Sequence, residues 1–129
     1  MPSNHGALVV IGSGPGIGVH VAGLFASKGF NKIILLSRDL KRLEDDASFV
    51  KSQAPAADVK LIALDVGADE AKVRGALAEV EKALGSTPLE CLLYNAARKG
   101  PSAMLEFSAE GYMADLQVSC SYYVYRGLG

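Results

Sequence analysis

The sequence has few of the residues that bind metals and no stretch that would cross a membrane. Its 129 residues include two cysteines and two histidines, and neither pair has the spacing of a metal or redox motif. Cys91 lies inside an apolar run, where we expect a buried thiol of the kind that suits a reducing compartment. No apolar run approaches a membrane span, and the first residues lack the cationic segment of a signal peptide. These absences favour a cytoplasmic protein without a metal or a membrane partner.

The chain also lacks an excess of either charge. Its formal net charge is −1, which provides no basic field for a nucleic-acid partner. Half of the residues are hydrophobic and 21% are charged, as is typical of a folded globular protein. We therefore expect residues 1–129 to form a single domain, with neither a linker nor an internal repeat.

Four short apolar runs are present, and each predicts a β-strand. The runs are continuous rather than alternating, which is typical of strands buried on both faces of a parallel sheet. They cover residues 7–12, 32–37, 59–65 and 89–95.

The segments between these runs carry apolar residues at helical spacing and predict one helix each. Strands that alternate with helices indicate an α/β fold with right-handed crossovers. A further helix is expected after a Gly-Pro loop, with Ser108 as its N-cap. The three earlier helical stripes are Ile17, Val21, Leu24 and Phe25; Leu40, Leu43, Ala47 and Val50; and Val73, Leu77, Val80 and Leu84.

Glycines gather where the first strand meets the first helix, in the stretch VVIGSGPGIG at residues 9–18. At such a junction a dinucleotide pyrophosphate binds the N-terminus of a helix. Gly12 would allow the tight turn off the strand, whereas Gly14 and Gly16 would leave main-chain N–H groups bare for phosphate oxygens. The last glycine would let the helix pack closely. The alternative is a glycine-rich turn without a ligand. The predicted loop residues are Gly12, Ser13, Gly14, Gly16, Ile17 and Gly18.

Two signatures of other enzyme classes are missing. No Lys-Ser/Thr pair follows the glycine loop, which argues against a P-loop nucleotidase. No Gly-x-Ser-x-Gly stretch occurs, which argues against a hydrolase of the nucleophile-elbow type. A methyl-donor site is the least favoured alternative, because the second strand there usually ends in a carboxylate rather than in an arginine such as Arg38.

Three motifs together resemble the short-chain dehydrogenase/reductase family. GSGPGIG at 12–18 is similar to the family's glycine loop, with Ile11 in place of its threonine. LDV at 64–66 is similar to the Asp-Val after the third strand, and YNAA at 94–97 resembles the Asn-Asn-Ala-Gly after the fourth, with departures at its first and last positions. The resemblance implies a Rossmann-type parallel sheet of strand order 3-2-1-4, flanked by helices, with the C-terminal half of the usual fold missing.

The same resemblance implies further cofactor-binding residues. Asp65 would bond the adenine amino group, and Val66 would line the adenine pocket. Asn95 and Ala96 match the family's motif at the end of the fourth strand, where it borders the cofactor.

The end of the second strand distinguishes between the two nicotinamide cofactors. An acidic residue there bonds the ribose 2′-hydroxyl of NAD, whereas an arginine accommodates the 2′-phosphate of NADP. Ser37 and Arg38 resemble the NADP pattern. Asp39 would favour NAD if it faced the ribose, but its position also suits an N-cap of the next helix. We expect NADP, with NAD the less favoured cofactor.

The family's hydride transfer uses a serine together with a Tyr-x-x-x-Lys pair, and this sequence has no such pair. Tyr122 and Arg126 have the spacing, but arginine is a poor substitute for the lysine. Ser119 stands where the family has an asparagine, and Tyr94 and Tyr112 are expected to be packing or surface residues. We therefore identify no catalytic residue.

Two functions follow from these observations. The first is the cofactor-binding portion of an NADP(H)-dependent short-chain oxidoreductase, truncated before its catalytic residues and inactive alone. The second is a nucleotide-binding module without catalysis, such as a sensor or a decoy subunit. In either case residues 89–95 would form a sheet edge that is apolar and free of lysine and proline, which favours self-association or a partner that covers the edge.

Overall fold

The computed structural model, which describes residues 5–97 and 108–120, contains a four-stranded parallel sheet in the order β3-β2-β1-β4. This is the strand order that the family resemblance implied. The strands are β1 (His5–Ile11), β2 (Phe30–Ser37), β3 (Asp58–Ala63) and β4 (Leu89–Tyr94). The helices are α1 (Ile17–Ser27), α2 (Leu40–Gln53), α3 (Glu70–Leu84) and α4 (Ala109–Cys120).

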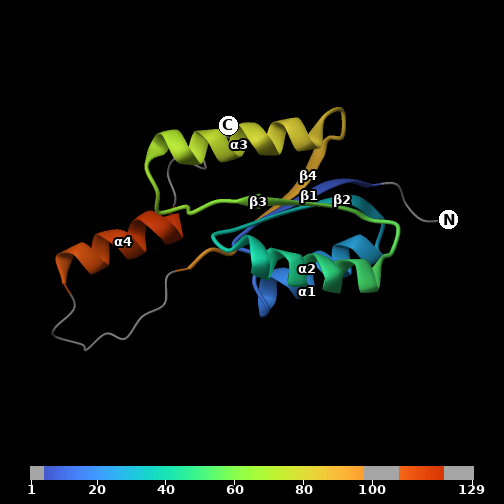
Figure 1. Cartoon of the computed structure of the whole chain (residues 1–129), viewed down its shortest axis with the longest axis horizontal. Coiled ribbons are helices and arrows are strands. Elements are labelled where there is room, and N and C mark those ends of the chain that lie inside the picture. The colour runs from blue at the N-terminus through green and yellow to red at the C-terminus, as the bar shows by residue number, and fades with distance from the viewer. Residues whose placement is uncertain (1–4, 98–107, 121–129) are drawn as a thin grey trace.

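Helices cover both faces of the sheet (Figure 1). α1 and α2 pack on one face, where Val19 and Leu43 join a buried cluster with one alternate set of residues from β1 and β2. α3 packs on the opposite face, where Val73 and Leu77 join the other alternate set. α4 lies at the carboxyl end of the sheet, apart from these two layers (Figure 1). The two clusters on either side of β1 and β2 form the core.

Full burial holds for most of the two central strands but not for the outer ones. Every residue of β1 after His5 is buried, and so are four consecutive residues of β2. β3 and β4 are largely exposed or half-buried, and Leu89 and Leu92 each retain 37% exposure. The expectation of two-sided burial is therefore wrong for 59–65 and 89–95. The reason is their place at the margins of the sheet, where helices cover less of them. Cys91 is accordingly half-buried.

Two of the large apolar residues of α1 point away from the core. Ile17 and Leu24 are 66% and 57% exposed. Small residues face the core instead, among them Gly18 and Gly23. A Cβ on Gly23 would lie 3.0 Å from the Phe49 ring, so the small residues allow α1 to lie close to α2. The predicted stripe was therefore wrong for Ile17 and Leu24, whereas Phe25 packs against the core. Hydrophobic spacing alone does not identify small contact residues.

The helix ends follow the local sequence. Asp39 accepts hydrogen bonds from the main-chain N–H groups of Lys41 and Arg42 and so caps α2. Ser108 Oγ accepts one from the Gly111 N–H at the start of α4, as predicted. These caps fix where α2 and α4 begin. α2 begins close to the carboxyl ends of the strands, whereas α4 approaches them with its C-terminal half (Figure 1).

Candidate functional site

The glycine loop lies at the carboxyl end of β1, between this strand and α1. The N–H groups of Gly12 and Ser13 both donate to the Leu36 carbonyl of β2, at 2.9 and 3.0 Å. The loop therefore turns over the end of the neighbouring strand. Because all four strands are parallel, Ile11 pairs with both Leu36 and Tyr94, and the carboxyl ends of β2 and β4 lie beside this loop.

Two of the loop glycines are required by close packing. Gly12 has a φ of 91°, and a Cβ on it would lie 2.4 Å from the Ala96 nitrogen. A Cβ on Gly18 would lie 3.1 Å from the Gly12 carbonyl oxygen. α1 thus packs directly on the loop, and the loop packs on the end of β4.

The other two loop glycines face open space. No protein atom described by the structure lies within 4 Å of a Cβ built on Gly14 or on Gly16. Gly16 is the N-cap of α1 and makes no side-chain cap bond, and the side chain of Ile17 is 66% exposed. The start of this helix therefore presents bare backbone, which an anion can approach.

Arg38 and Asp65 lie together in a hollow of about 170 Å³. Arg38 follows β2 and is exposed, and Asp65 follows β3. The Asp65 carboxylate accepts a hydrogen bond from the Gly67 N–H at 2.9 Å through Oδ1. The remaining lining comes from Gly67 and from three residues of α4, namely Ala114, Gln117 and Val118. Sequence reasoning did not identify Gln117 as a lining residue, since only the fold brings α4 to this hollow.

The residues next to Arg38 and Asp65 have structural partners. The Ser37 carbonyl accepts from the Leu64 N–H, and Ser37 Oγ accepts from the Asp39 N–H at 3.4 Å. Val66 is 7% exposed and packs in the core cluster beneath α3. Its side chain is therefore a packing residue, and the hollow is lined by its two neighbours rather than by Val66 itself.

The end of β4 joins the glycine loop to α4. The Asn95 N–H donates to the Ile11 carbonyl at 2.8 Å, and both Asn95 and Ala96 are half-buried. The Tyr94 hydroxyl donates to the Val118 carbonyl of α4. Tyr94 stands at the position where the sequence motif departs from the family pattern, and this contact anchors α4 against the sheet.

The loop has one buried contact that sequence reasoning missed. Ser13 Oγ donates to Asp46 Oδ2 of α2 at 2.7 Å, and both side chains are buried. The signal was present in the sequence, because Asp46 is three residues after Leu43 and four before Val50, on the predicted apolar face of the helix. A polar residue that is buried on such a face is expected to have a hydrogen-bond partner.

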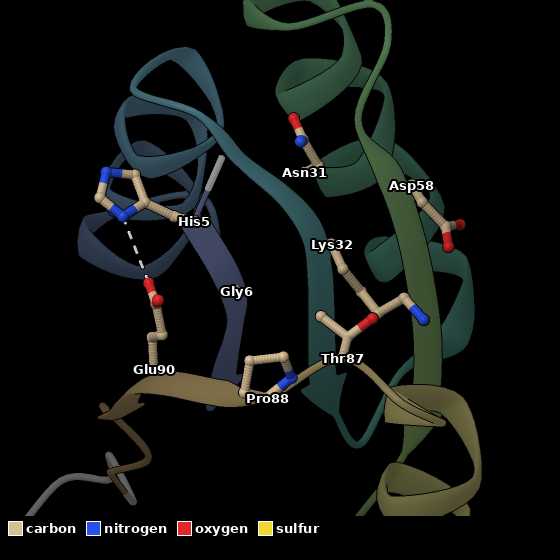
Figure 2. Close-up of a pocket in the computed structure, with 8 residues that line it drawn as sticks. All are labelled: His5, Gly6, Asn31, Lys32, Asp58, Thr87, Pro88 and Glu90. Carbon is tan, nitrogen blue, oxygen red and sulfur yellow. Dashed lines mark ion pairs between the residues drawn. The ribbon is translucent and has the colours of Figure 1, made fainter. Parts of the chain in front are cut away.

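A larger hollow, of about 430 Å³, lies at the opposite end of the sheet (Figure 2). His5 Nδ1 and Glu90 Oε2 lie 3.3 Å apart there, and Lys32 Nζ donates to the Ala83 and Leu84 carbonyls at the end of α3. These charged groups are thus engaged by neighbouring parts of the fold, and none of the predicted site residues lies here. The lining residues are His5, Gly6, Asn31, Lys32, Asp58, Thr87, Pro88 and Glu90.

Several expectations concern metals, membranes and catalytic tyrosines. Within residues 5–97 and 108–120, no group of three or more acidic, histidine or cysteine side chains is placed to hold a metal ion. In the same segments, no helix has the length and apolar character needed to span a bilayer. Tyr112 is exposed on α4, whereas Tyr122 and Arg126 lie outside the described residues, as does the side chain of Ser119.

Solved structures of short-chain dehydrogenases share this fold. L-sorbose reductase from Gluconobacter frateurii, complexed with NADPH and L-sorbose, has a TM-score of 0.81 and 25% identity, over 98% of this chain and 47% of that one. A short-chain dehydrogenase/reductase from Serratia marcescens has a TM-score of 0.80 and 22% identity, over 98% and 51%. A variant of actinorhodin polyketide ketoreductase with NADPH has a TM-score of 0.81 and 19% identity, over 96% and 46%. The chain spans about half the length of these structures.

None of the curated proteins matches the chain. The profile of the family described as short chain dehydrogenase matches residues 7–124, which run from β1 through α4 and include the glycine loop. The chain therefore belongs to the short-chain dehydrogenase family.

Proposed function

We propose that this chain binds NADP(H) at the carboxyl end of its sheet, as the cofactor-binding part of an oxidoreductase. When bound, the nicotinamide would supply or accept the hydride that is exchanged with a carbonyl or alcohol substrate. The observation that carries the proposal is the bare backbone of Gly14 and Gly16 at the N-terminus of α1. A phosphate group needs this combination of exposed N–H groups and a helix dipole.

The residues of the loop fit a pyrophosphate group. A side chain at Gly14 or Gly16 would project into the open space that the phosphates need, whereas glycine leaves it free. Gly12 and Gly18 hold the loop against β4 and α1 through their close backbone contacts. Ile17 and Asn95 would border the ligand, because they follow the loop and β4 at the same edge of the sheet.

The hollow around Arg38 fits the adenosine end of the cofactor. The Arg38 guanidinium would contact the 2′-phosphate. Oδ2 of Asp65, to which none of the described residues donates, would accept from the adenine amino group. Asp39 does not compete for the ribose, since its carboxylate caps α2. This supports NADP over NAD, because the acidic residue at the end of β2 is already engaged by the helix.

A second candidate is nucleotide binding without catalysis. The Tyr94 hydroxyl is engaged by the Val118 carbonyl, which favours a structural role for this tyrosine. Hydride transfer by this chain would then require a residue other than Tyr94. Both candidates share the same cofactor site and differ only in turnover.

Titration calorimetry with NADPH and with NADH tests the proposed site on the full chain. We expect NADPH to bind at least about tenfold more tightly than NADH, as one additional phosphate contact would provide. Failure to bind either nucleotide would overturn the proposal, and equal binding would overturn the preference for NADP. An assay for the oxidation of NADPH by carbonyl compounds, monitored as the loss of NADPH absorbance, would distinguish the oxidoreductase from the non-catalytic module.

A further inference from the structure

Asp46 is a buried acidic residue whose position no cofactor contact explains. Its side chain is 4% exposed, on the face of α2 that also buries Leu43 and Val50. Its carboxylate accepts one hydrogen bond, from Ser13 Oγ at 2.7 Å, and no other donor reaches it from the part of the chain that the structure describes. Ser13 is itself 6% exposed. These two side chains form an isolated polar contact within an apolar layer.

Such a contact is costly to maintain. A buried carboxyl group loses its hydration and recovers only part of it through a single hydroxyl donor. An apolar side chain at position 46 would complete the stripe of Leu43 and Val50 without that cost. The polar pair therefore fixes the position of the loop relative to α2, since a hydrogen bond between a hydroxyl and a carboxylate has a defined direction and distance.

The contact joins two segments that are distant in sequence. Ser13 is the second residue of the glycine loop, and its N–H is already bonded to the Leu36 carbonyl of β2. Asp46 is on α2, which begins immediately after Arg38 with the cap at Asp39. α2 thus begins two residues after Arg38, beside the hollow, and contacts the glycine loop through Asp46 in its second turn.

We propose that Asp46 is a positioning residue that clamps the glycine loop to α2 through the Ser13 hydroxyl. The clamp fixes the loop before a ligand arrives, so that the N–H groups following Ser13 are not reoriented on binding. The effect of the clamp on cofactor affinity depends on the proposed function, the binding of NADP(H). Asp46 contacts no ligand itself, and its effect is confined to the pyrophosphate end of the cofactor, because the Arg38 end is held by the separate cap at Asp39.

The clamp can be tested without any cofactor, by amide hydrogen exchange of the full chain. Asp46→Ala and Ser13→Ala should each speed exchange across residues 12–19 and leave α3 at its wild-type rate. Asp46→Asn should restore slow exchange, because the amide oxygen still accepts from Ser13 Oγ. Asp45→Asn is the matched control, since Asp45 is exposed on the same helix. Wild-type exchange in both alanine variants would overturn the clamp.

Binding measurements test its consequence for the ligand. We expect Asp46→Ala and Ser13→Ala each to lower the affinity for NADPH about five- to tenfold. The double variant should lose no more affinity than either single variant. The affinity of the same variants for adenosine 2′-monophosphate, which lacks the pyrophosphate, should change less than about twofold. Equal losses for both ligands would overturn the confinement to the pyrophosphate end. If Asp46→Ala does not fold, Ser13→Ala tests the same bond from the loop side.

These outcomes separate the clamp from the proposed function. If the wild-type chain binds no NADPH, the proposed function fails, and the exchange rates still decide whether Asp46 holds the loop. If the wild-type chain binds NADPH and every variant binds it equally well, the proposed function stands and Asp46 has no positioning role.

Discussion

Gly12 and Ala96 meet backbone to backbone, and a Cβ on Gly12 would lie 2.4 Å from the Ala96 nitrogen. The two residues follow β1 and β4, which pair directly at Ile11 and Tyr94. Their contact ties the glycine loop to the end of the neighbouring strand. Glycine at position 12 is therefore required by the fold itself, whether or not a ligand binds, which distinguishes it from Gly14 and Gly16.

This distinction predicts opposite effects of the same substitution. Gly12→Ala should lower the free energy of unfolding by about 2 kcal/mol or more, because φ is 91° and the methyl group would overlap Ala96. Gly14→Ala should leave stability unchanged or raise it by up to about 1 kcal/mol, since its φ is not positive and the space around it is open. Urea unfolding of both variants measures the difference. Similar losses in the two would contradict the assignment.

Gly16→Val tests the phosphate site directly. Outside the adjacent residues, no described atom lies within 4 Å of a Cβ at position 16, so the fold should be kept while the valine occupies the phosphate space and NADPH binding is lost. Calorimetry measures the affinity, and far-ultraviolet circular dichroism measures the fold. Gly75→Val is the matched control, because Gly75 also faces open space but lies on α3. Undiminished NADPH binding by Gly16→Val would remove the loop from the site.

Arg38→Ala tests the choice of cofactor. Loss of one charge-assisted phosphate contact should lower the affinity for NADPH about ten- to a hundredfold and leave the affinity for NADH nearly unchanged. Arg42→Ala removes the same charge from the first turn of α2, outside the hollow, and should leave both affinities within about twofold. If Arg38→Ala weakened both nucleotides equally, the guanidinium would contact adenine rather than the 2′-phosphate.

Much of the fold could be predicted because it depends on local pattern. The apolar runs at 7–12 and 32–37 indicated the buried central strands, and the glycine stretch marked the junction of β1 with α1. The exposure of the outer strands could not be predicted from the apolar runs, because the run at 89–95 has the same continuous pattern as a fully buried strand. Its place at the edge came instead from the family resemblance. Position in the sheet is set by the order of pairing.

The site was predictable where it rests on backbone and less so where it rests on tertiary contact. The positions of Gly14 and Gly16 followed from motif and junction alone. The partnership of Ser13 with Asp46 spans 33 residues and depends on how α2 packs. The approach of Gln117 to the Arg38 hollow depends on the placement of α4. Such contacts are set by the whole fold.

The outer strand β4 gives the last prediction, which concerns stability and self-association. Leu93 is half-buried against the cluster beneath α1 and α2, whereas the adjacent Leu92 points to the other face and is 37% exposed. Leu93→Lys should unfold the chain or cost several kcal/mol, because it buries a charge. Leu92→Lys should cost less than about 1 kcal/mol.

A lysine at position 92 should also reduce association through the edge of β4, since charged side chains discourage pairing between exposed strands. We expect wild-type sedimentation coefficients to rise with concentration and those of Leu92→Lys to stay constant. Lys60→Ala is a control on the opposite outer strand, where removing a charge should not reduce association. A wild-type chain that sediments as a monomer at every concentration would exclude self-association through β4.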